Sequence, residues 1–169
     1  GIGFASMINP SVGVLYAEGN FACVSIDLLA DGRLRVGAQS ADCGTSQNTV
    51  IGQIAAEELG LDADRIDVLH MDTEETPPDL GSAASRVTFV TGNAAIKTAK
   101  TFRATLAERL AARWDVPVDE IDFDNGIVSH RVDNARRLTL EEVAALEGPL
   151  RVEDRHYIDI PRPDPKTGY

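Results

Sequence analysis

Two short turn signals, each set between apolar runs, constrain the fold of this 169-residue chain most strongly. The first is Asp31-Gly32, which separates residues 21–29 from residues 34–38. The second is Asp124-Asn125-Gly126, with shorter apolar runs on either side. Asp-Gly and Asn-Gly pairs accept the positive φ angles that tight two-residue turns require, so both segments are predicted β-hairpins.

Helical periodicity predicts two main helices and a shorter third one. Residues 49–59 place apolar side chains on one stripe and end at Gly60, a typical helix stop. Residues 92–113 repeat apolar side chains every three or four positions. Residues 139–146 begin with the Thr-Leu-Glu-Glu form of a capping box. The other predicted strands are 66–71, 120–123, 127–129 and 152–160.

Together these elements predict an α+β fold, a mixed α/β arrangement in which a small mixed sheet with hairpins packs against two main helices. Two prolines and a glycine exclude regular structure from residues 72–84. Residues 1–160 fit one subdomain, and the proline-rich residues 161–169 are expected to be a tail or linker. No signal peptide or lipidation motif precedes the first methionine, Met7, so we expect the start at Gly1 to be a cut.

Charge and apolar patterning limit the function classes. Sixteen basic and 27 acidic residues give a net charge of −11 and a pI near 4.6. Nucleic-acid binding needs a basic face, so we expect no nucleic-acid partner. No apolar run approaches the roughly 20 residues of a membrane helix, so no membrane partner is expected. Cys23 and Cys43 are too few for a disulfide framework or a four-ligand zinc site, which favours reduced thiols and a cytoplasmic location.

Two features with possible chemistry also have simpler structural interpretations. Residues 91–113 carry five basic side chains and one acidic side chain. This segment could receive an anion, but the pattern is more typical of a solvated helix face. Cys43 could be a nucleophile if a base lay beside it, but it is more typical of a small buried thiol.

Metal binding is the third candidate. His70 and Asp72 would share one face of a strand, and Glu74 and Glu75 follow in the next loop. A strand that ends in an acidic loop explains the same residues, and no histidine lies at a typical zinc-binding spacing. We therefore predict no metal site on the protein itself.

Two loops rich in small residues precede the main helices. Residues 44–49 open the first helix, and residues 81–88 lead into the second. Small side chains let a ligand approach the backbone, and free N–H groups beside hydroxyls suit an anion such as a phosphate. In the second loop Ser85 can bond a phosphate oxygen and Arg86 can pair with it. The alternative is that both loops are ordinary helix caps.

A longer pattern runs through both loops. Its motifs are Ala41-Asp42-Cys43-Gly44, residues 53–60, Asp72-Thr73 with Pro77, residues 81–88, and Gly92-Asn93-Ala94. In this order they resemble the large, molybdopterin-binding subunit of the molybdenum hydroxylases, which include xanthine dehydrogenases, aldehyde oxidoreductases and carbon monoxide dehydrogenases. Residues 85–89 with residues 92–94 resemble the hydroxybenzoyl-CoA reductase alpha-subunit branch most closely. The resemblance covers the chain from Gly1 to about Tyr157.

The resemblance implies a pyranopterin cofactor, molybdopterin, whose dithiolene holds molybdenum. It implies six cofactor-binding residues: Ala84, Ser85, Arg86, Val87, Gly44 and Thr45. Thr45 stands where the family has the glutamine of a Gly-Gln-Gly motif, and it offers no carboxamide; Gln47 lies two positions further on. The family's catalytic glutamate belongs to a segment outside this chain. We therefore predict no catalytic residue here, no activity of the chain alone and no retained cofactor.

The implied partners are the rest of the large subunit and the iron–sulfur and flavin subunits. The parent protein is expected to be an oxidoreductase that acts on aromatic, heteroaromatic or aldehyde substrates. A subdomain on its own exposes apolar faces, which predicts a homodimer through one of them. The alternative is a stand-alone, non-enzymatic α/β module that binds other proteins, and the Thr45-Ser46 replacement favours this second hypothesis.

Overall fold

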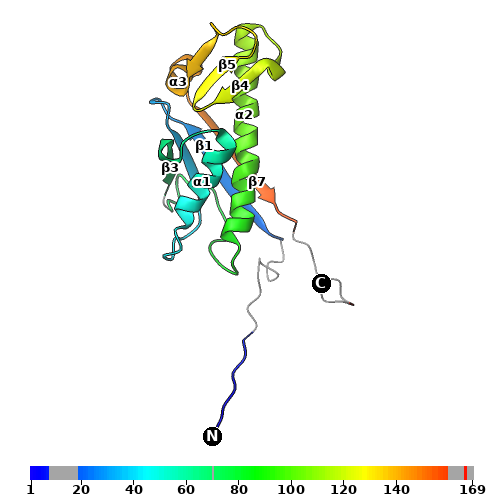
Figure 1. Cartoon of the computed structure of the whole chain (residues 1–169). Helices are drawn as coiled ribbons and strands as arrows, with labels where there is room; N and C mark the ends of the chain where they lie inside the picture. Colours follow the sequence, from blue (N-terminus) through cyan, green and yellow to red (C-terminus); the bar gives the residue numbers. More distant parts are fainter. Residues whose placement is uncertain (8–18, 70, 160–165, 167–169) are drawn as a thin grey trace.

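The first predicted hairpin lies at the centre of the larger sheet in the computed structural model, which describes residues 1–7, 19–69, 71–159 and 166 (Figure 1). Strand β1 (Phe21–Leu28) pairs antiparallel with β2 (Leu34–Ala38). Gly32 has a φ of 78° in the turn between them, a conformation that suits glycine. The first hairpin prediction is confirmed.

Two more strands complete this four-stranded sheet, whose order is β3-β2-β1-β7. β3 (Ile66–Leu69) runs parallel to β2, and β7 (Leu150–Tyr157) runs antiparallel to β1. The sheet is therefore mixed, as predicted. β7 begins two positions before the predicted start and ends at Tyr157, so the predicted extension through residues 158 and 159 is wrong. Ile160 and the predicted tail lie outside the described residues, apart from Lys166.

Two helices cover one face of this sheet (Figure 1). α1 (Gln47–Leu59) ends at Gly60, which has a φ of 67° and donates its N–H to the last carbonyls of the helix. α2 (Gly92–Trp114) follows a π-helical turn, η2 (Val87–Thr91), that the sequence did not predict. Side chains from alternate positions of β1 meet the apolar stripe of α2 in the core: Ala22, Val24, Ile26, Leu28, Ala95, Ala99, Phe102, Leu106 and Leu110.

A second, smaller sheet lies beside the far end of α2 (Figure 1). Strands β4 (Ile121–Asp124), β5 (Ile127–His130) and β6 (Arg137–Thr139) are antiparallel in this order, so the second hairpin prediction is confirmed. The predicted capping box is also present at α3 (Leu140–Glu147). β6 was not predicted, because three residues are too few to show alternation. The α+β fold class is correct, with two sheets and three α-helices in the described part of the chain.

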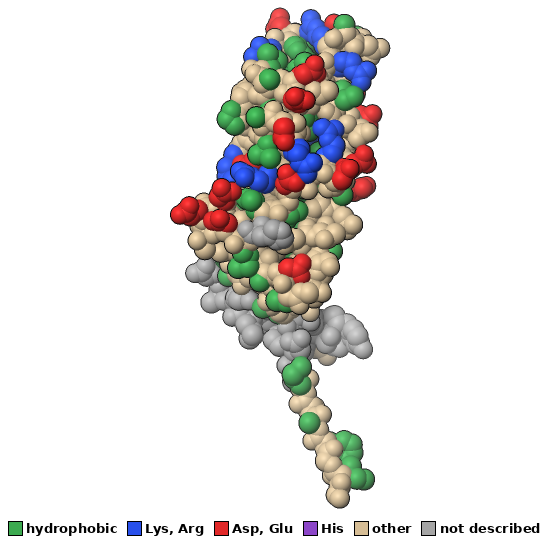
Figure 2. Space-filling model, turned by 90° about the vertical axis from the view of Figure 1, so that its left-hand side faces the viewer, with side chains coloured by type: hydrophobic (Ala, Val, Ile, Leu, Met, Phe, Trp, Pro, Cys, Tyr) green, Lys and Arg blue, Asp and Glu red, His purple; other side chains and the backbone are tan. Residues whose placement is uncertain are grey.

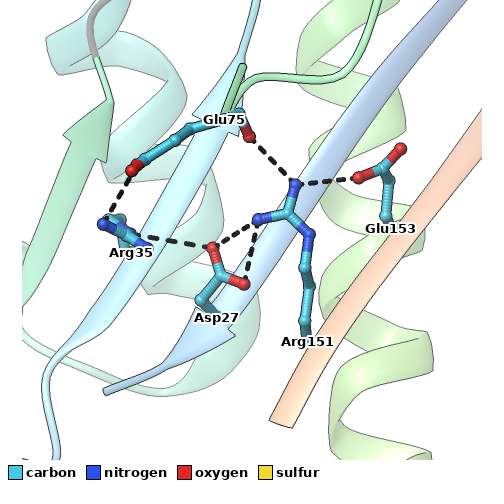
Figure 3. Close-up of polar contacts among 5 residues, drawn as sticks. All are labelled: Asp27, Arg35, Glu75, Arg151 and Glu153. Carbon is cyan, nitrogen blue, oxygen red and sulfur yellow. Dashed lines mark hydrogen bonds and ion pairs between the residues drawn. The ribbon is translucent and has the colours of Figure 1, made fainter. Parts of the chain in front are cut away.

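Charged side chains fix a loop to the sheet face that the helices leave uncovered (Figure 3). Asp27 on β1 accepts two hydrogen bonds from Arg151 Nη1 on β7, at 2.9 and 3.1 Å. The Glu75 carboxylate lies 3.2 Å from Arg35 Nη1, and the Glu75 carbonyl accepts from Arg151 Nη2 at 3.0 Å. Glu153 accepts a further bond from Arg151 at 2.8 Å. The start of the loop between β3 and η2 is thereby held over three strands.

The surface carries mixed charge. On the face drawn in Figure 2, Lys and Arg side chains lie next to Asp and Glu side chains across the middle of the molecule. Among the described residues, no helix combines the length and the apolar character needed to span a membrane.

Candidate cofactor-binding pocket

A pocket lies between the loops that precede α1 and the η2–α2 helix. Its volume is about 360 Å³, within the roughly 300–1,000 Å³ typical of small-molecule sites. The α1 side contributes Cys43, Thr45, Gln47 and Val50, and the other side contributes every residue from Ser82 to Thr88. The structure thus brings together five of the six residues that the resemblance singled out. Gly44 does not line the pocket.

The α1 side of the pocket is shaped by Asp42. Its Oδ1 atom accepts hydrogen bonds from the backbone N–H groups of Gly44, Thr45 and Ser46, at 2.9, 3.1 and 3.2 Å. Ser46 has a left-handed φ of 56°. The expectation of free N–H groups is therefore wrong for Gly44, Thr45 and Ser46, because the Asp42 side chain already accepts from them. Because its backbone N–H is already bonded, Thr45 presents only its exposed side chain to the pocket.

Gln47 connects the two loops. Its Nε2 donates to the Ala41 carbonyl at 2.5 Å, and its Oε1 lies 3.0 Å from the Ser82 hydroxyl. The same hydroxyl lies 2.8 Å from the Ala41 carbonyl. Both ends of the Gln47 carboxamide are therefore engaged within the protein, and the residue braces the pocket walls against each other.

The second loop presents an unusual backbone. Ala84 and Ser85 have consecutive left-handed φ angles of 49° and 53°, which few side-chain-bearing residues adopt. Ser85 and Thr88 are exposed, and both line the pocket. The helical turn η2 starts two positions after Ser85 and includes Thr88. The first N–H groups of a helix have no intrahelical acceptor. Two hydroxyls and the positive end of a helix dipole therefore meet on this side of the pocket.

The Arg86 guanidinium bonds groups within the protein and is not directed at a ligand in the pocket. Its side chain is fully buried, with Nη1 donating to Asp79 Oδ1 at 2.6 Å and to the Gly81 carbonyl at 2.9 Å. Nη2 donates to the Phe21 carbonyl of β1. The expectation that this guanidinium pairs with a phosphate is not met in this conformation, because its Nη1 and Nη2 donors already bond a buried carboxylate and two backbone carbonyls. Burial raises the pKa of Asp79, and Arg86 only partly offsets that rise.

The other sequence candidates do not form a site. Cys43 is exposed at the pocket, so the interpretation as a buried thiol is wrong. Within the described residues, no group of three or more His, Cys, Asp or Glu side chains is placed to hold a metal ion; His70 lies outside them. The basic residues of α2 are partly neutralised, because Lys100 lies 4.0 Å from Glu58 and Arg113 pairs with Glu147. This favours the solvated helix face.

Sequence reasoning missed the residues that shape the pocket. Asp42 precedes a glycine by two positions, a spacing typical of Asx turns that could have signalled its role. Asp79 lies inside a loop predicted only to be irregular, and its partners are Arg86 and Gly81 further along the same loop. Asp79 precedes Gly81 by the same Asx-turn spacing, but no local pattern marks its pairing with Arg86.

Comparison with known proteins identifies the family. A sequence model of the family described as "Molybdopterin cofactor-binding domain" matches residues 1–168. The chain belongs to this family.

Three curated proteins are similar in sequence to this chain. The gamma subunit of the 6-hydroxypseudooxynicotine dehydrogenase complex of Paenarthrobacter nicotinovorans is 33% identical over 78% of the chain and 16% of that protein. A probable xanthine dehydrogenase subunit of Bacillus subtilis is 33% identical over 85% of the chain and 19% of that protein. The beta subunit of the isoquinoline 1-oxidoreductase of Brevundimonas diminuta is 28% identical over 71% of the chain and 16% of that protein. The chain thus spans less than a fifth of each relative's length.

Solved structures show the same fold. The Cu,Mo-CO dehydrogenase in its carbon monoxide reduced state superposes with a TM-score of 0.71 at 22% identity, over 88% of this chain and 20% of that one. The reconstituted CO dehydrogenase from Oligotropha carboxidovorans gives a TM-score of 0.69 at 25% identity, over 84% of this chain and 18% of that one. The molybdenum hydroxylase assignment from the sequence motifs is confirmed at the level of the family.

Proposed function

We propose that the pocket forms one wall of the molybdopterin site and that it binds the phosphate and the polar edge of the pterin. The observation that carries this is the convergence of the Thr45, Ser85 and Thr88 side chains on the start of a helix. A helix start with free N–H groups is a natural place for a phosphate, and hydroxyls add directional hydrogen bonds.

The residues present fit such a ligand. The volume of about 360 Å³ suits a compact heterocycle, and the lining combines apolar side chains with hydroxyls. The left-handed backbone at Ala84 and Ser85 carries small side chains, which leaves the peptide groups open to close approach. Six residues are proposed to contribute, namely Ala84, Ser85, the backbone of Arg86, Val87, Thr88 and Thr45.

When bound, the cofactor supplies molybdenum held by its dithiolene and thereby the redox chemistry of the parent enzyme. The role of this chain is binding and orientation. Ser85 and Thr88 hydroxyls donate to the ligand's anionic oxygens, and the N-terminal dipole of the helix stabilises their charge. Val50 and Val87 give the pocket an apolar wall that shields one side of the ligand from water. No residue of this wall is assigned to proton or hydride transfer.

The wider setting is also proposed. The chain would act as a subdomain, residues 1–160, of a cytoplasmic enzyme of the hydroxybenzoyl-CoA reductase branch or a close relative. Its electron partners would be iron–sulfur and flavin subunits. The substrate would be an aromatic, heteroaromatic or aldehyde compound. Support comes from the sequence motifs and from relatives whose names describe them as subunits of dehydrogenases and oxidoreductases.

The test uses the oxidised, phosphorylated pterin derivative of the cofactor, which is fluorescent, as the probe. We expect weak, saturable binding that inorganic phosphate displaces. Hydrogen bonds to a charged group contribute about 1.5–3 kcal/mol each. The double variant that carries both Ser85→Ala and Thr88→Val removes two of them and should weaken binding by at least about 100-fold.

Thr105→Ala is the matched control, because Thr105 is a half-buried residue of α2, outside the pocket lining, whose hydroxyl donates to the Thr101 carbonyl at 2.8 Å. Its affinity should equal that of the unaltered chain. If the unaltered chain shows no saturable binding, or if the two variants bind equally well, the proposal is wrong. The non-enzymatic protein-binding module then becomes the better interpretation.

A further inference from the structure

A fully buried ion pair closes the base of the pocket loop. The side chains of Asp79 and Arg86 both have zero exposure, and their charged atoms lie 2.6 Å apart. Gly81 is bonded from both sides, since its N–H donates to Asp79 Oδ1 at 2.8 Å and its carbonyl accepts from Arg86 at 2.9 Å. The chain from Gly81 to Arg86 is therefore drawn into a short closed loop.

This loop contains the strained part of the pocket. Ala84 and Ser85, with their left-handed φ angles, lie between the two ends that the ion pair joins. Arg86 also donates to the Phe21 carbonyl, at the start of β1. Register pairs between β1 and β2 begin at Val24, so Phe21 lies beyond the end of β2. The guanidinium thus satisfies a strand carbonyl and attaches the pocket loop to the sheet.

Net stability is a poor explanation for this pair. The desolvation of two charges offsets most of their attraction, and apolar replacements of a buried pair are often neutral or stabilising. Among the described residues, Arg86 Nε has no hydrogen-bond acceptor, so the guanidinium is incompletely satisfied. In some proteins, buried charges of this kind fix one arrangement of the groups around them.

We propose that Asp79 and Arg86 are positioning residues that hold Ala84 and Ser85 in the left-handed conformation needed to present the Ser85 hydroxyl and the helix start to the ligand. The effect of this conformation on ligand binding rests on the proposed function. The backbone conformation of Ala84 and Ser85 can be measured without any ligand. Strained backbone persists only where the surroundings impose it, and the ion pair supplies that constraint.

The experiment compares the unaltered chain with a double variant that carries both Asp79→Leu and Arg86→Met and therefore lacks both charges. We expect cooperative unfolding and a similar Tm. We also expect the ¹³Cα chemical shifts of Ala84 and Ser85 to leave the left-handed range, and affinity for the oxidised pterin phosphate to fall at least about tenfold. The control is Asp122→Leu with Arg131→Met, which removes a bidentate but exposed pair on the small sheet. It should change neither the shifts nor the affinity.

A second variant keeps the test decisive if the double variant does not fold. Arg86→Lys retains the charge, but one ammonium cannot reach Asp79, the Gly81 carbonyl and the Phe21 carbonyl together. It should stay folded with a lower Tm, because a buried acceptor loses its donor, and it should lose part of the left-handed population. Unchanged ¹³Cα shifts in Arg86→Lys, or in a folded double variant, overturn the inference. If the unaltered chain binds no pterin, the proposed function fails, while the shifts measured without ligand still decide the positioning role.

Discussion

The contact between the central hairpin and α3 gives the sharpest prediction about the fold. Gly32 combines a φ of 78° with close packing, because a Cβ added there would lie 2.9 Å from Glu141 Cα and closer still to Glu141 N. A left-handed conformation costs an alanine about 1–2 kcal/mol, and backbone displacement to relieve an overpacked contact costs about 1–3 kcal/mol. Gly32→Ala should therefore lower the free energy of unfolding by about 2–5 kcal/mol.

Urea denaturation followed by circular dichroism measures this loss, and the Tm should fall by about 4–20 °C for a domain of this size. Gly60→Ala is the matched control. Gly60 has a φ of 67°, but the nearest atoms to an added Cβ lie at 3.9 Å, so only the conformational strain of about 1–2 kcal/mol applies. If Gly32→Ala is no more destabilising than Gly60→Ala, the packing of α3 on the hairpin is not as described.

Three further predictions concern pH, capping and association. Burial lowers the pKa of His156, with Lys97 adding to the effect, so the folded chain binds fewer protons than the unfolded chain below about pH 6.5. The free energy of unfolding should therefore fall as pH drops from about 7.5 to about 5.5, and His156→Gln should lose that dependence in urea titrations; an unchanged slope contradicts it. Thr139→Ala removes the hydroxyl that accepts from Glu142 N at 3.2 Å and should cost about 0.5–2 kcal/mol, whereas no measurable loss would show that the cap is not formed. Ile2, Phe4 and Met7 are each at least 85% exposed, and several exposed apolar side chains on one segment favour association. Sedimentation should therefore detect self-association that Phe4→Ser weakens, and a strict monomer at high concentration refutes the homodimer.

Local signals in the sequence were sufficient for much of the fold. Asp31-Gly32 predicted the first hairpin because the turn residues themselves determine the backbone conformation, and Gly60 predicted the end of α1 for the same reason. The Thr139–Glu142 capping box is likewise a contact within one helical turn. β3 was predicted as a strand, but its parallel pairing with β2 depends on the intervening helix and could not be predicted from its own residues.

The pocket was only partly predictable, since its chemistry depends on distant contacts. Small residues and hydroxyls marked the loop from Gly81 to Thr88, and the structure brings them to a pocket. The direction of the Arg86 side chain could not be predicted, because it depends on Asp79 and on the Phe21 carbonyl, which lies 65 positions away in sequence. Cys43 was expected to be buried, but its loop folds over Asp42 and leaves the thiol at the pocket surface.

The most direct test of the central claim is a ¹H–¹⁵N NMR titration of the unaltered chain with the oxidised pterin phosphate. The claim is that the loop before the η2–α2 helix and the Thr45 side of the pocket bind this ligand together. We predict saturable shifts concentrated at Ala84–Thr88 and at Thr45, with inorganic phosphate moving a subset of the same amides. Shifts that are absent, or that cluster away from this pocket, would contradict the assignment of the molybdopterin wall.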